Sequence, residues 1–247
     1  ADDFLPQSKW IGSEHCQSTP NTWLCFRKTV HLPGVPGEMI ANIAVDSKYW
    51  LWINGKMVVF EGGLKRGPAP GATYYDQVDI APYLEKGENI IALLVWHFGK
   101  NGFSHVNSGT AALLFCAQGA NLSIVSDKSW QCSVYRAYQN TEAPFPNYRL
   151  SESNIRFDAR KELAGWNMPD FSGKLGASIE IVAPNEMPFG KLVARPIPMW
   201  KNGGLTDYPE VVKNEKGDTI RCRLPYNCQI TPYLHVKAPA GLVVGML

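Results

Sequence analysis

The residues best suited to chemistry in this sequence gather in two loops between β-type segments. The first loop, residues 61–71, is rich in glycine and proline and carries the pair Lys65-Arg66. An arginine guanidinium can donate two parallel hydrogen bonds to a sugar diol or a carboxylate. Tyr74 and Tyr75 follow the loop and offer rings on which a sugar could stack. A structural interpretation stays open, in which Arg66 pairs with an acid of a neighbouring domain and the tyrosines alternate between core and surface.

The second loop, residues 97–109, interleaves hydrogen-bonding side chains with aromatic ones after a long apolar run. Amides and imidazoles can bind sugar hydroxyls while rings cover the apolar face, although the same loop could instead pack against another domain. His97 and His105 have no cysteine or acid between them, so a transition-metal site is not indicated. The predicted carbohydrate-binding residues are Arg66, Tyr74, Tyr75, His97, Lys100, Asn101 and His105.

Catalysis and metal binding are both poorly supported by the acidic residues. An inverting glycosidase needs two carboxyl groups about 6.5–9.5 Å apart, one of them with a raised pKa. Asp79 instead is expected to cap the turn at residues 80–82. Calcium takes about six or more oxygen ligands, and the two loops offer Asn101 and Asn107 but few acids. We therefore expect no catalytic residue, no metal and no cofactor, a structural calcium ion being unsupported by the sequence.

Composition points to a folded, exported protein. The 247 residues are 45% hydrophobic and 19% charged, which is enough to build a substantial core. A net charge of +2 without a basic run does not indicate nucleic acid, and no apolar stretch reaches the roughly 18 residues of a membrane span. Eight Trp and ten Tyr suit carbohydrate handling. Residues 1–3 resemble a mature terminus left after removal of a signal peptide.

The six cysteines leave two interpretations open. An even count permits disulfides in an exported chain, and the pairs Cys16–Cys25 and Cys222–Cys228 are close in sequence. Cys116, however, lies in an apolar run, where a buried thiol acts as a small hydrophobic side chain. We favour mostly free, buried thiols, and the lack of a C-x-x-C pair argues against zinc.

The elements that must position the two loops are short β-strands. Asn54-Gly55 between two alternating segments predicts a type I′ hairpin turn, because both central residues need positive φ. Trp50 and Trp52 alternate onto one face and favour core packing. Residues 90–96 form a continuous apolar run whose length fits a strand buried on both faces. The expected strands are residues 39–45, 49–53, 56–60, 90–96, 112–116, 122–125 and 179–182.

Helical patterning is nearly absent, which predicts an all-β fold. The one candidate helix covers residues 158–164, with Asp158 as its N-cap and Gly165 ending it. Prolines and glycines cluster at residues 184–214 and mark a boundary. We predict a jelly-roll domain at residues 1–195, a linker at 196–216, and the first strands of an incomplete second β-sandwich at 217–247. These last strands are expected at residues 220–224, 229–236 and 242–247.

A series of short motifs runs in order along residues 8–200. Its members are Lys9-Trp10-Ile11-Gly12, Phe26-Arg27-Lys28, Trp52-Ile53-Asn54-Gly55-Lys56, residues 75–84, Lys86-Gly87-Glu88-Asn89, residues 126–130, Phe157-Asp158-Ala159-Arg160 and Gly165-Trp166. The series resembles the N-terminal region of bacterial α-L-rhamnosidases of glycoside hydrolase family 78. The resemblance implies a galactose-binding-like jelly roll.

The same resemblance implies a function by association with a larger enzyme. Family members are multidomain exo-enzymes that remove terminal L-rhamnose by inversion, with the catalytic acid and base in an (α/α)6 barrel C-terminal to the β-sandwiches. We expect a non-catalytic, carbohydrate-binding-like accessory region that positions glycan and braces the catalytic domain of the same or a companion polypeptide. Its expected location is the periplasm or the outside of a bacterial cell. A stand-alone carbohydrate-binding module and a purely structural β-sandwich without ligand are the alternatives.

Overall fold

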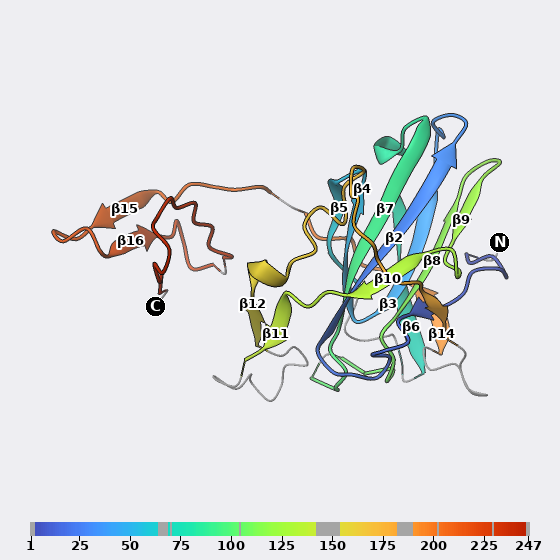
Figure 1. The fold of residues 1–247 in the computed structure, drawn as a ribbon, viewed down its shortest axis with the longest axis horizontal. Coiled ribbons are helices and arrows are strands. Elements are labelled where there is room, and N and C mark those ends of the chain that lie inside the picture. The colour runs from blue at the N-terminus through green and yellow to red at the C-terminus, as the bar shows by residue number, and fades with distance from the viewer. Residues whose placement is uncertain are drawn as a thin grey trace. The chain divides into compact units, whose positions relative to one another are not determined.

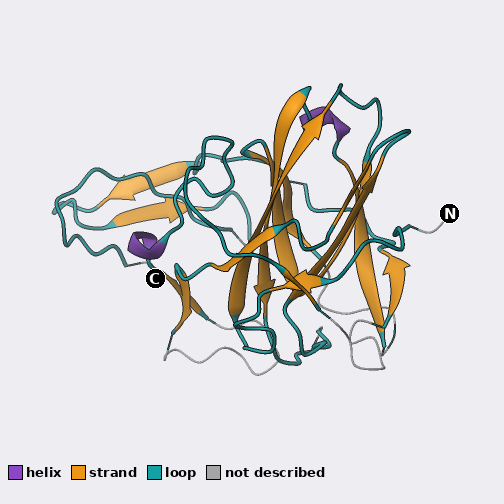
Figure 2. Ribbon diagram, turned by 45° about the vertical axis from the view of Figure 1, so that its right-hand side comes forward, coloured by secondary structure: helices purple, strands orange, loops and turns teal. Residues whose placement is uncertain are grey.

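The computed structural model describes residues 3–63, 69, 71–103, 105–141, 154–181, 190–201, 203–228 and 230–245. Strands dominate these residues, and the helical segments among them are two short 3-10 turns, η1 (Ala81–Tyr83) and η2 (Ala159–Lys161) (Figure 2). None of these helical segments is long and apolar enough to cross a membrane. The all-β prediction is confirmed. The chain divides into two compact units, Ala1–Trp200 and Lys201–Leu247, which are described separately.

The first unit contains two facing β-sheets (Figure 1). All strand pairs are antiparallel except β14 with β6, and a small separate ladder joins β11 (Tyr138–Asn140) to β12 (Ile155–Phe157). The larger sheet has the order β13 (Ile179–Glu180), β1 (Ile11–Gly12), β8 (Ala112–Gln118), β3 (Ile40–Asp46), β6 (Ala72–Asp79), β14 (Lys191–Ala194), with β9 (Ser123–Val125) beside β8. The smaller sheet has the order β10 (Gln131–Val134), β2 (Thr22–Leu32), β7 (Gly87–His97), β4 (Lys48–Ile53), β5 (Lys56–Gly62).

The main core lies between these two sheets. Alternate side chains of β4 enter it, since Tyr49, Leu51 and Ile53 are fully buried in the same cluster as residues of the larger sheet. Trp50 and Trp52 point to the opposite face and pack in a second cluster that includes Trp166. The outer face of the smaller sheet is therefore covered too. This second cover explains why the apolar run at residues 90–96 is buried on both faces, as predicted.

Two turn predictions are confirmed in detail. Asn54 and Gly55 both have positive φ, 51° and 77°, as a type I′ hairpin turn between β4 and β5 requires. Asp79 accepts a hydrogen bond from the backbone N–H of Ala81 at 3.0 Å, and so caps the turn η1.

The helix expected at residues 158–164 is wrong in extent. Asp158 does accept from the backbone N–H of Arg160, but the helical stretch is only η2, and Glu162 is already extended. Beyond it the carbonyls of Trp166 and Met168 both accept from the guanidinium of Arg27, at 3.1 and 2.9 Å. These carbonyls are bonded to a side chain of the sheet rather than to a helical turn.

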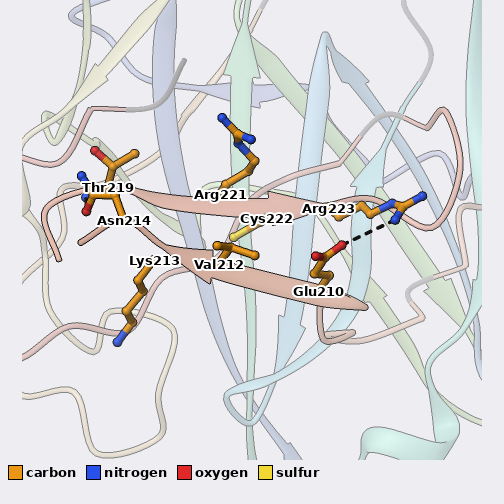
Figure 3. Close-up of a pocket in the computed structure, with 8 residues that line it drawn as sticks. All are labelled: Glu210, Val212, Lys213, Asn214, Thr219, Arg221, Cys222 and Arg223. Atoms are coloured by element: carbon orange, nitrogen blue, oxygen red, sulfur yellow. Dashed lines mark hydrogen bonds and ion pairs between the residues drawn. The ribbon is translucent and has the colours of Figure 1, made fainter. Parts of the chain in front are cut away.

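The second unit contains one two-stranded antiparallel sheet, β15 (Glu210–Lys213) and β16 (Ile220–Arg223). Every residue of both strands is exposed, and a hollow of about 500 Å³ lies along the pair (Figure 3). Glu210 and Arg223 form an ion pair at 3.5 Å at one end of the hairpin (Figure 3). A lone two-stranded sheet has no core of its own.

Two of the three strands predicted for this unit are not formed. Residues 230–245, which cover the described parts of the segments expected at 229–236 and 242–247, contain no strand. Pro232 and Pro239 have no N–H to donate to a ladder, which disfavours pairing there. β15 lies inside the segment expected as a linker, residues 196–216. The boundaries at 195 and 217 and the incomplete second sandwich stay predictions.

A glycine on β5 permits a close contact between two strands of the smaller sheet. A Cβ atom built on Gly62 would lie 2.2 Å from Cζ of the buried Tyr49 ring. We predict that Gly62→Ala lowers the free energy of unfolding by about 1–3 kcal/mol, because the ring must shift in a packed core. Urea unfolding measures the change. Gly34→Ala is the matched control, since its Cβ would meet nothing within 4 Å, and an equal effect of both substitutions would contradict the packing argument.

Candidate functional site

Both predicted ligand loops emerge at the same end of the sandwich. The register places Thr22 opposite His97, Lys48 opposite Trp96, and Tyr49 opposite Gly62. The starts of β2, β4, β6 and β8 and the ends of β3, β5 and β7 therefore gather there. We call this the loop end, and it is the lower end of the sandwich in Figure 1. Neighbouring loops that share one rim can line a common binding surface.

The structure places the first predicted loop only in part. Arg66 lies outside the described residues. Tyr75 is buried, its hydroxyl donates a hydrogen bond to Asp3, and its ring meets Phe4 edge-on with centroids 5.1 Å apart. Tyr75 therefore offers no open stacking face. Tyr74 is half-buried and pairs with Val193 of β14, so the two tyrosines alternate as the structural interpretation expected.

His97 and His105 come together, but beneath the surface. Both are buried, and both face the buried carboxylate of Asp46 at the end of β3. Nδ1 of His97 lies 3.3 Å from Oδ1 of Asp46, and Nε2 of His105 lies 3.6 Å from the same atom. The other oxygen, Oδ2, accepts from the backbone N–H of Ser108 at 2.8 Å. The burial of these histidines is at odds with the expected direct contact with a sugar. In the structure they contact Asp46 beneath the loop instead.

The charge of Asp46 is strongly stabilised by this cluster. Burial alone raises the pKa of Asp46, but the hydrogen bond and charge of His97, together with His105 and Ser108, lower it to about 2. A carboxylate accepting several hydrogen bonds from such donors stays ionised over the physiological range. Asp46 thus ties the end of β3 to the end of β7 and to residues 105–108.

Ser47 completes an apparent serine–histidine–aspartate arrangement that is not built for nucleophilic attack. Its Oγ lies 3.4 Å from Nε2 of His105, but its hydroxyl donates to Asp46 and it accepts from the backbone N–H of Phe98 at 3.1 Å. A nucleophilic serine hands its proton to the imidazole and faces the substrate. Ser47 is fully buried and does neither, so the cluster is structural.

The cluster presents an exposed turn above it. Gly102 and His105 form a bridge, with the N–H of Gly102 donating to the carbonyl of His105 at 3.0 Å, and Phe103 on this turn is 75% exposed. The side chain of Asn101 accepts from the backbone N–H of Asn107 at 2.8 Å, so Asn101 shapes the loop. Lys100 is half-buried. Phe103 and Asp46 were missed by sequence reasoning, although the Asn101-Gly102 pair before Phe103 is a turn signal.

A second buried carboxylate supports the base of the first loop. Asp76 of β6 is 1% exposed and accepts from the hydroxyl of Tyr49 at 2.9 Å and from the backbone N–H of Gly63 at 2.7 Å. The guanidinium of Arg195, just after β14, donates to it at 3.1 Å. All of these donors come from different strands or their ends. The cluster therefore fixes the chain where residues 61–71 leave β5.

Metal chemistry and disulfide bonds have no visible basis in the part of the chain that the structure describes. No group of three or more His, Cys, Asp or Glu side chains is placed there to hold an ion. All six cysteines are free thiols, four of them buried: Cys16, Cys25, Cys116 and Cys132. Cys222 is exposed and Cys228 is half-buried.

The chain was compared with known proteins. No protein-family model matches it, and no curated protein sequence does. Among solved structures it is similar to a family 78 rhamnosidase of Bacillus sp. GL1, with 28% identity and a TM-score of 0.70 over 78% of this chain. The α-L-rhamnosidase of Aspergillus terreus has 21% identity and a TM-score of 0.60 over 86% of this chain, and that of Dictyoglumus thermophilum has 21% and 0.58 over 84%.

These similarities confirm the resemblance found in the sequence. The fold is that of a β-sandwich region found in α-L-rhamnosidases. The chain spans only 20% of the Bacillus enzyme, 25% of the Aspergillus enzyme and 24% of the Dictyoglumus enzyme. The similarity therefore concerns one part of each of these proteins.

We predict that the free energy of unfolding depends on pH through the ionisation of Asp46. Since its pKa falls from about 3.9 in the unfolded chain to about 2, ionised Asp46 stabilises the fold above pH 4 by about 2 kcal/mol, and this contribution disappears as the pH falls toward 2. Asp46→Asn should lower the free energy of unfolding at pH 7, and the difference from the native chain should shrink between pH 4 and pH 2. Guanidinium unfolding across this range measures it.

Asp170→Asn, at an exposed position, is the control and should change the free energy of unfolding only slightly. An Asp46→Asn difference that stays constant down to pH 2 would show that the buried charge is not what stabilises the loop end.

Proposed function

We propose that this chain is a non-catalytic, carbohydrate-recognising region of a larger α-L-rhamnosidase-type glycoside hydrolase. The observation that carries this proposal is the 28% identity, over 78% of the chain, to one fifth of a family 78 rhamnosidase. The glycan or rhamnoside would bind at the loop end, and the catalytic domain would belong to the same or a companion polypeptide. An exported location, periplasmic or extracellular, belongs to the same proposal.

The state of the buried carboxylates supports a non-catalytic role. A glycosidase acid needs a raised pKa, and it must face substrate. The pKa of Asp46 is lowered instead, and Asp76 is enclosed by Tyr49, Gly63 and Arg195. At the loop end the two buried carboxylates are thus used to hold strands and loops.

The exposed side of the loop end supports sugar recognition. Phe103 offers a ring, and the neighbouring Lys100 offers a cationic hydrogen-bond donor. The turn that carries Phe103 is held by its Gly102–His105 bridge and by the imidazole below it. A loop that is already ordered loses less conformational entropy on binding, which suits the weak contacts that sugars make.

A purely architectural role is the second candidate, and one observation favours it. Three residues predicted to contact sugar, Tyr75, His97 and His105, are buried in internal networks. Such residues can serve stability alone. The two candidates differ in whether the exposed residues at the loop end bind glycan.

The first test is enzymatic. We predict that the 247-residue chain does not hydrolyse p-nitrophenyl α-L-rhamnopyranoside at neutral pH, because the acid–base pair lies elsewhere in the parent enzyme. Release of p-nitrophenol, followed spectrophotometrically at high protein concentration, measures this. A rate above the buffer control that persists through repeated purification would overturn the non-catalytic proposal.

The second test is binding. We predict that the chain is retarded in affinity electrophoresis on a rhamnose-rich polysaccharide, and that Phe103→Ala weakens this binding about 5- to 10-fold, since an aromatic face contributes roughly 1 kcal/mol or more. Tyr226→Ala is the matched control, because Tyr226 is 72% exposed and lies in the second unit. Equal retardation of both variants would exclude the loop end, and no retardation of the native chain would favour the architectural role.

A further inference from the structure

A second cavity lies at the open edge where the two sheets of the sandwich meet. β10 is the edge strand of the smaller sheet and β13 is the edge strand of the larger one. A single bridge between Gln131 and Ala177 joins these edges. The cavity beside this bridge has a volume of about 490 Å³, which lies within the range of small-molecule sites, about 300–1,000 Å³.

The wall formed by β10 and residues 176–178 is firmly built. The backbone N–H of Cys132 donates to the carbonyl of Gly176 at 2.8 Å, and the N–H of Gly176 donates to Oγ of Ser133 at 2.8 Å. A Cβ on residue 176 would lie 2.8 Å from the carbonyl oxygen of Cys132, so only glycine permits this close approach. The oxygen of the Ser133 hydroxyl accepts from the N–H of Gly176. The same hydroxyl can still donate its proton to a ligand.

The charged side chains around the cavity favour an anion. Arg136 and Lys161 supply two permanent cations, against the single carboxylate of Glu14, and His15 lies beside them. Arg136 is also close enough to Cys16 to affect its thiol: burial raises the pKa of that thiol, while Ser13 and Arg136 oppose the rise. A guanidinium can bind a carboxylate through two charge-assisted hydrogen bonds.

The residues that flank Lys161 are engaged elsewhere. Arg160 pairs with Asp158 at 2.8 Å, and the carboxylate of Glu162 accepts from the hydroxyl of Tyr135 at 3.1 Å. Lys161, between them, lines the cavity. Among the residues that line the cavity, the two cations Arg136 and Lys161 therefore outnumber the one carboxylate of Glu14.

We propose that this edge cavity binds one uronate unit of an acidic glycan. Arg136 and Lys161 would hold the carboxylate, Ser133 and Glu14 would bind ring hydroxyls, and Leu163 with its apolar neighbours would cover the less polar ring face. A site for a simple inorganic anion would need the two cations, but it would need neither the apolar wall at Leu163 nor the carboxylate of Glu14 as a hydrogen-bond acceptor. The inference rests on the proposed function because it assumes a glycan ligand. It adds a second site, separate from Phe103, that recognises a charged sugar unit.

Isothermal titration calorimetry with digalacturonate tests the proposal on the whole 247-residue chain. We expect binding that weakens about 10-fold or more in Arg136→Gln and in Lys161→Gln, and that falls as salt is raised, because each variant loses a charge-assisted contact. The methyl ester of the same disaccharide should bind at least 10-fold more weakly. Arg160→Gln, one residue from Lys161 but paired with Asp158, is the matched control and should bind as the native chain does.

The proposal would be overturned if the native chain did not bind digalacturonate, if the methyl ester bound equally well, or if the affinity were unchanged in both Arg136→Gln and Lys161→Gln. Displacement of the disaccharide by equimolar inorganic phosphate would reduce the cavity to a general anion site and overturn the saccharide assignment. If digalacturonate does not bind but the chain is still retarded on the neutral rhamnose-rich polysaccharide, only the uronate site is refuted. Phe103→Ala should leave digalacturonate binding unchanged.

Discussion

Asp46 places a negative charge inside one end of the sandwich, and the loop end depends on that charge being matched. An isolated buried carboxylate would cost several kcal/mol, whereas hydrogen bonds and partial or full charges on its neighbours offset this cost. The partners come from well-separated parts of the chain, since His97 ends β7 and His105 and Ser108 lie in the following loop. One buried group therefore ties a sheet end to a long loop that has little regular structure.

In this arrangement, the residues that hold the loops in place differ from the residues that are exposed at the loop end. The buried imidazoles and carboxylates at the loop end hold the chain, and Phe103 above them is 75% exposed. Asp76 does the same for the other loop by binding Tyr49, Gly63 and Arg195. Polar residues that bind a ligand and polar residues that hold a loop in place look alike in a sequence. His97 and His105 were therefore predicted to bind sugar, although the structure buries them in the network that holds the loop.

The predictable parts of the fold depend on local patterns. The Asn54-Gly55 turn, the alternation of β4 and the apolar run of β7 each follow from neighbouring residues, and each is confirmed. The parallel pairing of β14 with β6 joins residues more than a hundred positions apart, and no local pattern encodes it. Asp46 was missed for the same reason, because His97, His105 and Ser108 are about fifty or more residues away from it. The edge cavity was missed because it is assembled from four separate segments, none of which carries a motif of its own.

The two candidate surfaces differ in chemistry in a way that suits a long glycan. The loop end presents an aromatic ring, and such a ring can cover the apolar face of many sugars and so discriminates little between them. The edge cavity presents a guanidinium and an ammonium, whose attraction for a carboxylate is selective by charge. Two weak contacts on one rigid sandwich act together when a single chain reaches both, since the second contact is then intramolecular. Under the two proposals above, a glycan that reaches both surfaces would be selected by its carboxylate as well as by its rings.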